Sequence, residues 1–423
     1  MPLLFNVFLV LAALLAIQSL YSLFEGFRFS RFVRLSRTAP RPNFEPQAAV
    51  IVPVKGLDDQ FQTHVEQLLA QDYPGYGLIF TLAEQADPAY SFLADRLRTF
   101  RAARGWGPRR VEVVVAGLTH ERGEKVNNLL AALRAVPPDN RVLVFADADA
   151  SFKRDWLRSL IGPLSDPAVT VSTGFRWYLP GRTFASRLRA AWDASIATTF
   201  GDHRRNLAWG GSMAVRADDF RRLKVAECYW AGSVSDDYGL YRAVRENAGW
   251  IRFEPRCLLA SSEETTLSQF LNWSNRQVII TRVYAPHLWL QGLLSYSFFC
   301  ATLLLGLGLG LLSGPTPRRL SALGLDAVIL LLGLGKARLR ESVAIRVFPE
   351  QGRSLRRLGA SYWLFWPFVP WVMLFNLVTA ALTRKIEWRG TCYHLVSPTT
   401  LRVLSRRRQP SASPARNSVA PGS

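Results

Sequence analysis

Apolar residues gather in four long stretches, one near the start of the chain and three near its end. Residues 3–24 are nearly all apolar and carry no charge. At 1.5 Å per residue, such a helix spans the roughly 30 Å hydrocarbon layer of a bilayer. The C-terminal stretches cover residues 287–312, 320–335 and 362–382. The pattern predicts transmembrane helices at both ends of a soluble middle domain.

The first stretch has two interpretations, a cleaved signal peptide or a retained anchor. A signal peptide needs a basic start and small residues at a cleavage site. Here the first charge is Glu25, and Arg28 and Arg31 follow among phenylalanines. This favours a transmembrane anchor over residues 1–27 and a basic juxtamembrane linker over 28–47. The arginines predict that the next domain is cytoplasmic, because basic residues stay on that side.

The C-terminal membrane region, residues 288–383, allows two or three spans. Three spans would place the basic, partly disordered tail 384–423 on the opposite side of the membrane from the middle domain. Two spans, with residues 320–335 lying in the interface, would place both on the same side. The basic residues of the tail favour two spans, because they would then stay on the cytoplasmic side, whereas the lengths of the apolar segments allow three. The sequence therefore leaves both numbers open.

The middle domain, residues 48–264, alternates short β-rich runs with helical stretches. This alternation predicts an α/β fold with a mainly parallel sheet covered by helices on both faces. Ligands in such folds bind beyond the carboxyl ends of the strands. The predicted strands are 48–54, 78–83, 111–116 and 141–146, and the predicted helices are 58–71, 89–103 and 124–136.

Polar side chains follow several of these strands. Asp147-Ala148-Asp149 comes directly after the run 141–146, and residues two apart in an extended chain point the same way. Two such carboxylates suit Mg²⁺ or Mn²⁺, which prefers oxygen ligands and is often shared with phosphates. The alternative is a solvated turn or a helix cap. Neither a G-x-G-x-x-G nor a G-x-x-x-x-G-K-[ST] phosphate loop is present.

The net charge of the chain and its distribution indicate which kinds of partner to expect. The chain has 423 residues, 52 basic and 32 acidic, for a net charge of +20. Much of this charge flanks apolar segments, where anionic lipid attracts it. No zinc-finger spacing or RNA-binding signature is present, so we expect no nucleic-acid partner. The four cysteines are widely spaced and predict packing roles.

Eight short motifs, in order, resemble the family-two type of glycosyltransferase with a GT-A fold, which is Rossmann-like with a mainly parallel sheet. Within it the chain is most similar to ceramide glucosyltransferases and bacterial lipid glycosyltransferases of the hopanoid type. The motifs are Pro53-Val54-Lys55-Gly56, Gln71-Asp72-Tyr73-Pro74, Ala86-Asp87-Pro88-Ala89, Lys125-Val126-Asn127-Asn128-Leu129, Asp147-Ala148-Asp149, Gly210-Gly211-Ser212, Asp236-Asp237-Tyr238 and Ser268-Gln269-Phe270.

The resemblance implies roles for the acidic residues. Asp147 and Asp149 match the D-x-D that holds the metal and the diphosphate of a UDP-sugar. Glu84 falls where the family often has an aspartate contacting uracil or ribose. Asp237 matches the proposed base, and Asp236 replaces the usual glutamate beside it. Because Ser235-Asp236-Asp237 begins a helical run, capping is the alternative role of these carboxylates.

The family's R/Q-x-x-R-W motif is altered here to Trp273-Ser274-Asn275-Arg276-Gln277. Only the central arginine is kept, and the resemblance implies that Arg276 reaches the donor diphosphate. Trp273 is a candidate for the acceptor site. Residues 265–287 alternate apolar and polar positions, which predicts an amphipathic helix in the membrane interface.

Six further candidate residues each have a structural alternative. Lys125 and Asn127 could bind phosphate or sugar hydroxyls, or form a solvated helix face. Residues 210–212 lack bulk, so Gly210, Gly211 and Ser212 could admit the acceptor or form a tight turn. His203 falls near a histidine of the ceramide enzymes, and a structural histidine is the alternative.

Together these features predict an inverting glycosyltransferase that moves a hexose from a UDP-sugar to a lipid hydroxyl at the membrane surface. A processive polysaccharide synthase and a non-catalytic sugar-nucleotide or lipid-binding protein are the alternatives. The excess of arginine over lysine is typical of a GC-rich bacterial genome. It favours the inner membrane, with the catalytic domain in the cytoplasm.

Overall fold

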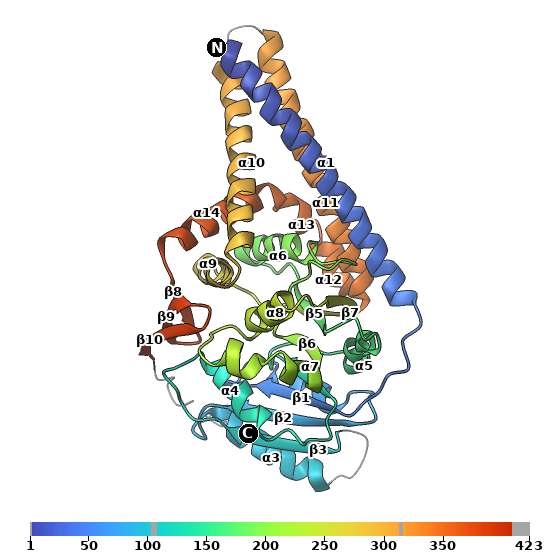
Figure 1. Cartoon of the computed structure of the whole chain (residues 1–423). Helices are drawn as coiled ribbons and strands as arrows, with labels where there is room; N and C mark the ends of the chain where they lie inside the picture. Colours follow the sequence, from blue (N-terminus) through green and yellow to red (C-terminus); the bar gives the residue numbers. More distant parts are fainter. Residues whose placement is uncertain (1, 103–107, 313–315, 408–423) are drawn as a thin grey trace, which may run out of the picture.

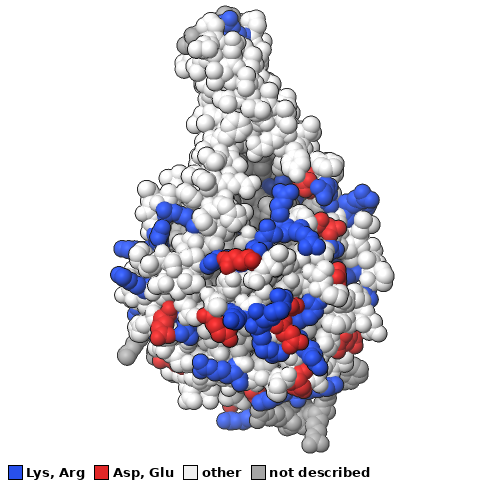
Figure 2. Space-filling view, viewed as in Figure 1, with Lys and Arg blue, Asp and Glu red and all other residues white. Residues whose placement is uncertain are grey.

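The computed structural model describes residues 2–102, 108–312 and 316–407, which form a body and a protruding stalk (Figure 1). The stalk consists of α1 (Pro2–Thr38), α10 (Pro286–Leu312) and α11 (Thr316–Val347), which contact one another. Charged residues cover the body, whereas the stalk is almost free of them along its length (Figure 2). Each of these helices has a long apolar run, and the charged residues of α1 and α11 lie mostly toward the helix ends, which is the form expected of a membrane-embedded part.

The body is built on a seven-stranded sheet with the order β3-β2-β1-β4-β6-β5-β7. The first four strands in this order are parallel, which confirms the predicted parallel half: β1 (Ala48–Pro53), β2 (Tyr76–Leu82), β3 (Arg110–Val115) and β4 (Val142–Ala146). β6 (Ser212–Arg216) runs antiparallel to β4 and to β5 (Val171–Tyr178). β5 in turn is parallel to β7 (Ile251–Ser261).

Helices cover both faces of this sheet, as the continuous apolar strands predict. In β1, Val50 and Val52 belong to a core on one face, and Ala49 and Ile51 to a core on the other. Successive side chains of a strand point to opposite faces, so an apolar run serves both cores. The helices of the body are α2 (Phe61–Leu69), α3 (Pro88–Ala102), α4 (Glu124–Leu133), α5 (Trp156–Ile161), α6 (Phe184–Ala197), α7 (Ala217–Arg222) and α8 (Asp236–Glu246), with short helical turns at Gly162–Ser165 and Val225–Trp230.

Between body and stalk lies α9 (Leu267–Tyr284), within the range predicted as an interfacial helix. Thr266 caps it by accepting from Gln269 N, and the Gln269 side chain accepts in return from Thr266 N. After the stalk the chain forms Pro349–Gln351, α12 (Gly352–Leu358), α13 (Ser361–Leu364), Trp366–Phe368 and α14 (Val369–Leu382). α14 lies across the foot of the stalk and contacts both α9 and α10 (Figure 1).

Two segments are more regular than the sequence predicts. α1 continues to Thr38, into the predicted linker, because Phe29 and Val33 pack against α11. The predicted tail begins with a three-stranded antiparallel sheet of β8 (Lys385–Trp388), β9 (Thr391–Ser397) and β10 (Thr400–Arg406), called here the C-terminal sheet. Residues 408–423 lie outside the described part of the chain.

The C-terminal sheet bears on the number of spans. Within the described residues, four helical segments are long and apolar enough to cross a membrane, including Ser361–Leu382. However, the hydroxyl of Tyr393 in β9 accepts a hydrogen bond from Glu124 N of α4, 3.3 Å away, so the C-terminal sheet and the body share one side. For a chain that crosses a membrane, this contact is compatible only with an even number of crossings between the body and the C-terminal sheet.

Of the described C-terminal helical segments that are long and apolar enough to cross a membrane, two belong to the stalk and one does not. α11 runs along α1 and α10 approaches them toward the tip of the stalk, whereas α14 lies across the foot of α10 (Figure 1). The sequence had offered residues 320–335 as the interfacial segment, because that apolar run is short. The structure instead includes them in the 32-residue helix α11, whose basic C-terminal part extends the helix beyond its apolar run.

Candidate active site

The two aspartates of the D-x-D motif lie at the carboxyl end of β4, beside the loop that leads into β6. Asp147 N donates to Gly211 O over 3.3 Å, so the motif and the glycine pair are adjacent. We call this edge of the sheet the rim. With Asp236 and Asp237 at the start of α8, the two aspartates form a group that we call the acid cluster.

Each carboxylate of the D-x-D motif is held by cations. Lys125 Nζ lies 2.8 Å from Asp147 Oδ1, and Arg176 Nη2 lies 3.3 Å from Asp147 Oδ2. Arg176 also pairs with Asp149 Oδ1, and Arg389 Nη2 lies 3.1 Å from Asp149 Oδ2. All four carboxylate oxygens therefore face a positive charge.

Arg176 comes from β5 and is buried. Burial acts to raise the pKa of Asp149, but the guanidinium groups of Arg176 and Arg389 hold this pKa well below its usual range. Asp149 is thus ionised at neutral pH. Arg176 is not among the site residues predicted from the sequence, but a signal existed, because an arginine in a buried apolar strand needs an acidic partner.

Lys125 joins the two halves of the acid cluster. Its Nζ lies 3.1 Å from Asp236 Oδ2 as well as close to Asp147, and it donates to Gly210 O over 3.4 Å. Burial lowers the pKa of Lys125, but the surrounding aspartates outweigh it and raise the pKa above its usual value. Of its two predicted roles, the solvated helix face is therefore wrong, because the amine is enclosed by carboxylates.

Asp236 and Asp237 differ in environment although they are neighbours. Asp236 is 1% exposed, and burial raises its pKa to about 6 against the opposing charge of Lys125. Asp237 is half-buried; its Oδ1 accepts from Tyr238 N over 2.7 Å and from the Ser235 hydroxyl. Its Oδ2 faces Gly210 N at 3.5 Å. Ser235 itself caps α8, as the sequence allowed.

The glycine pair permits the close approach of the rim loop to these charges. A Cβ at Gly210 would lie 2.9 Å from Lys125 Nζ and would collide with Asp236. A Cβ at Gly211 would lie 2.6 Å from Asp147 Oδ2 and would overlap the ring of Trp209. Ser212 has another role, since its buried hydroxyl accepts from Trp156 Nε1 at 2.8 Å.

α9 brings Arg276 and Trp273 to the same side of the body. Arg276 lies over the ring of Trp388, 5.3 Å from its centroid, and donates to Glu387 O over 3.3 Å. Burial lowers its pKa to about 10, so the guanidinium stays charged at neutral pH. Trp273 packs edge to face on Tyr178 and Trp192, with centroids 5.4 and 5.2 Å away.

Arg389, at the turn between β8 and β9, is the second cation of the site that is absent from the sequence-based prediction. Besides Asp149, it donates to Lys55 O over 2.6 Å, and Lys55 pairs with Glu124 at 2.8 Å. Nothing in the local sequence marks Arg389, because it lies 240 residues from its partner.

Three predicted site residues make other contacts. Glu84 is exposed at the end of β2, where its carbonyl accepts from Asp87 N at 3.2 Å. Asn127 donates to Gly117 O over 2.8 Å, and both ring nitrogens of His203 bond within their own loop, to Thr199 O and Arg205 N. Among the described contacts, none joins these three side chains to the acid cluster.

The acid cluster fits a metal shared with a ligand better than a metal held by protein alone. In the described residues, no three His, Cys, Asp or Glu side chains are grouped to hold a metal. Asp147 and Asp149 could supply two oxygen ligands, since each carboxylate oxygen has a second lone pair. The remaining ligands would be water and phosphate, as is usual for Mg²⁺.

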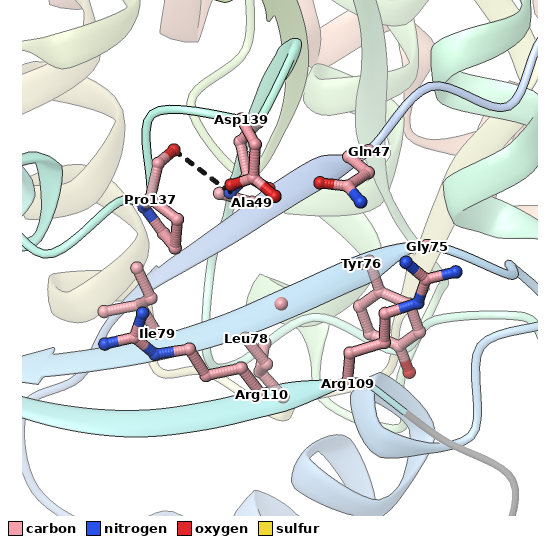
Figure 3. A pocket seen from close by; sticks show the side chains of 12 residues that line it. Gln47, Ala49, Gly75, Tyr76, Leu78, Ile79, Arg109, Arg110, Pro137 and Asp139 are labelled. Atoms are coloured by element: carbon pink, nitrogen blue, oxygen red, sulfur yellow. Dashed lines mark hydrogen bonds between the residues drawn. The ribbon is translucent and has the colours of Figure 1, made fainter.

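A pocket of about 340 Å³ lies at the opposite edge of the sheet (Figure 3). Gln47 and Gly75, just before β1 and β2, line it together with Arg109 and Asp139. These residues are at the amino ends of the parallel strands, whereas the acid cluster is at the carboxyl ends. The pocket is therefore separate from the rim.

An acidic rim on a mainly parallel sheet, beside helices suited to a membrane, is the architecture expected of a membrane glycosyltransferase. The chain matches Glycosyl transferase family 21 over residues 8–401 and belongs to that family. The predicted glycosyltransferase class and the GT-A-like fold are thereby confirmed. The finer resemblance to ceramide and hopanoid-type enzymes stays a prediction.

Similar folds occur among solved structures. The mannosyltransferase PcManGT from Pyrobaculum calidifontis, solved with GDP-Man and Mn²⁺, is 17% identical, with a TM-score of 0.44 over 88% of this chain and 98% of its own. Glucosyl-3-phosphoglycerate synthase from Mycobacterium tuberculosis, solved with phosphoglyceric acid, is 16% identical, with a TM-score of 0.37 over 58% of this chain and 85% of its own. The comparison with curated proteins finds no match.

Proposed function

We propose that this glycosyltransferase moves a hexose from a UDP-sugar to the hydroxyl of a membrane lipid, a ceramide-like or other lipid alcohol, with inversion. The observation that carries the proposal is the convergence of Asp147 and Asp237 on one glycine loop, with Asp149 linked to Asp147 through their shared partner Arg176. Asp147 N donates to Gly211 O, and Asp237 Oδ2 faces Gly210 N. The acid cluster thus combines carboxylates for a metal with a carboxylate for a proton.

Donor binding would use the metal-binding aspartates of the acid cluster together with the cations beside them. Asp147 and Asp149 would hold Mg²⁺ or Mn²⁺, which supplies charge neutralisation for the diphosphate when it is bound. Arg276 is charged, and Asp149 is among the groups that act on it electrostatically. Preorganised cations of this kind stabilise the charge that develops on a leaving diphosphate.

Proton removal would fall to Asp237. Its Oδ1 is fixed by Tyr238 N and Ser235, which leaves Oδ2 toward the glycine loop. The acceptor hydroxyl gives its proton to Oδ2 as its oxygen bonds to the anomeric carbon. The bond from that carbon to the diphosphate oxygen breaks, and UDP leaves. Asp236, paired with Lys125, would position this turn of α8.

A lipid acceptor is supported by the location of α9. This helix contacts α6 and α8 of the body and α10 and α14 of the membrane region. Its half-buried Trp273 packs on the buried rings of Tyr178 and Trp192, which fixes its position on the side of the helix that faces the body. A lipid could keep its chains in the bilayer and raise only its head group to the rim. We propose that the rim is cytoplasmic, at a bacterial inner membrane.

The direct test compares the lipids of cells that express the chain with those of cells that lack it, by mass spectrometry. UDP-glucose and UDP-galactose are then supplied to the purified protein with each lipid that changes. The expected result is one lipid heavier by a hexose with the wild type, and none with Asp237→Asn. No hexose transfer by either form would instead favour a non-catalytic binding protein, and a growing glycan would favour a polysaccharide synthase.

A further inference from the structure

The turn between β8 and β9 has an unusual backbone. Arg389 and Gly390 both have positive φ values, +44° and +78°, as in the tight two-residue turn typical of hairpins. Such turns favour Asn-Gly or Gly-Gly, because a larger side chain with positive φ is strained. An arginine at the first position suggests that its side chain has a use that offsets the strain.

The C-terminal sheet is docked on the rim by contacts along its length. Tyr393 of β9 accepts from Glu124 N, and Arg406 of β10 donates to Thr119 O. At Gly232 the body approaches the turn between β9 and β10 so closely that a Cβ would collide with Thr399 O. The sheet therefore holds the Arg389 turn against the acid cluster.

At that position Arg389 bridges two parts of the rim. Its Nη2 pairs with Asp149 Oδ2 at 3.1 Å, while its Nη1 donates to Lys55 O at 2.6 Å. The neighbouring residue, Trp388, lies under the guanidinium of Arg276. An aromatic partner for Arg276 thus comes from the C-terminal sheet, in a chain whose motif has Gln277 where the family has tryptophan.

We infer that Arg389 is a diphosphate-binding residue of the donor site, held on Asp149 until a nucleoside diphosphate arrives. This inference rests on the proposed function. Asp149 is the carboxylate that would be shared with metal and diphosphate, so its pairing with Arg389 must weaken when the donor binds. The guanidinium fork matches a phosphate group as well as a carboxylate. Arg389 can keep its bond to Lys55 O while its other nitrogens turn to the β-phosphate.

The test measures binding to the full-length protein in lipid nanodiscs, by titration calorimetry with Mn²⁺. The ligands are UDP, GDP and UMP, the last of which lacks the β-phosphate. Loss of one charge-assisted contact predicts that Arg389→Ala binds the diphosphate about 10- to 100-fold more weakly, with UMP affinity changed less than about threefold. Arg389→Lys should recover part of the loss, because it restores the charge without the fork. Arg402→Ala, an exposed arginine of the same sheet, should match the wild type.

The outcomes separate the inference from the proposed function. If the wild type binds neither UDP nor GDP, the proposed function fails. If the wild type binds UDP and Arg389→Ala binds it equally well, the inference alone is overturned. An equal loss for UDP and UMP, with a lower melting temperature, would show that Arg389 only holds the sheet in place and would also overturn it.

Discussion

The acidic and basic halves of the rim are built in different ways. The acid cluster comes from two short motifs, at residues 147–149 and 236–237. The cations that pair with it, Lys125, Arg176 and Arg389, come from α4, β5 and the β8–β9 turn, and α9 adds Arg276 nearby. The acids are thus a local property of the sequence, whereas their counter-ions are assembled by the fold. The difference suggests that the acids carry the chemistry and the cations tune and support it.

The variant with the largest expected effect is Asp237→Asn, which tests whether the acid cluster carries the chemistry. Removing a general base lowers turnover by about 10²- to 10⁴-fold, so we expect a loss of this size in the rate of hexose transfer. Donor affinity, measured by calorimetry with UDP and Mn²⁺, should change little, because Asp237 would touch the acceptor. An equal loss of affinity would place Asp237 in the donor site instead.

Arg176→Met tests the support role of the cations. Losing hydrogen bonds to charged groups costs about 1.5–3 kcal/mol of stability, because Asp147 and Asp149 lose their shared counter-ion but keep Lys125 and Arg389. We expect a marked drop in the free energy of unfolding, measured by denaturant titration in detergent. Arg402→Met is the matched control.

A double variant checks the physical cause of this loss. Asp149→Asn added to Arg176→Met should cost less than the sum of the two single changes, since the two residues share one ion pair that either change alone already removes. Strict additivity would mean that Arg176 acts through its packing and not through its charge.

The pH dependence of stability allows a comparison of two buried carboxylates, Asp193 and Asp149. Asp193 is 3% exposed and accepts from Tyr178 N at 3.0 Å, and burial raises its pKa to about 7. Because the folded-state pKa exceeds the usual value of about 3.9, folding is favoured by the protonated form. This contribution, about 1–4 kcal/mol, is present below pH 4 and is lost as the pH rises through 7.

The ionisation of Asp149 changes the stability of the protein with pH in the opposite direction. Its pKa is held low by Arg176 and Arg389 despite burial, so its contribution is present above pH 4 and is lost in acid. Thermal unfolding between pH 4 and 8 should therefore show Asp193→Asn gaining on the wild type as the pH rises. A constant difference across this range would mean that burial does not shift the pKa of Asp193.

The smallest effect is expected for His203→Ala. Both ring nitrogens bond to backbone atoms of residues 199–205, and the side chain is only half-buried. Surface changes of this kind are usually within about 0.5 kcal/mol, so transfer activity should stay within about threefold of the wild type. A larger loss of activity, with unchanged stability, would return His203 to the acceptor site, as the resemblance to the ceramide enzymes implies.

How much of the site could be predicted varies with the distance between partners. The D-x-D motif, the Asp236-Asp237 pair and Lys125 could be found, because each follows a recognisable strand or begins a helix. Arg176 could have been suspected from its place in an apolar strand. Arg389 could not, since its contact with Asp149 depends on the chain returning from the membrane region to the rim.

The sequence by itself determined the apolar helices, the parallel half of the sheet and the acid cluster, because hydrophobic periodicity and short motifs act over a few residues. Only the tertiary structure decided that α14 lies across the stalk, that residues 385–406 fold back onto the body, and which cations hold the aspartates. These features depend on packing and ion pairs between residues far apart in the chain, whose free energy is gained only once the fold has brought them together.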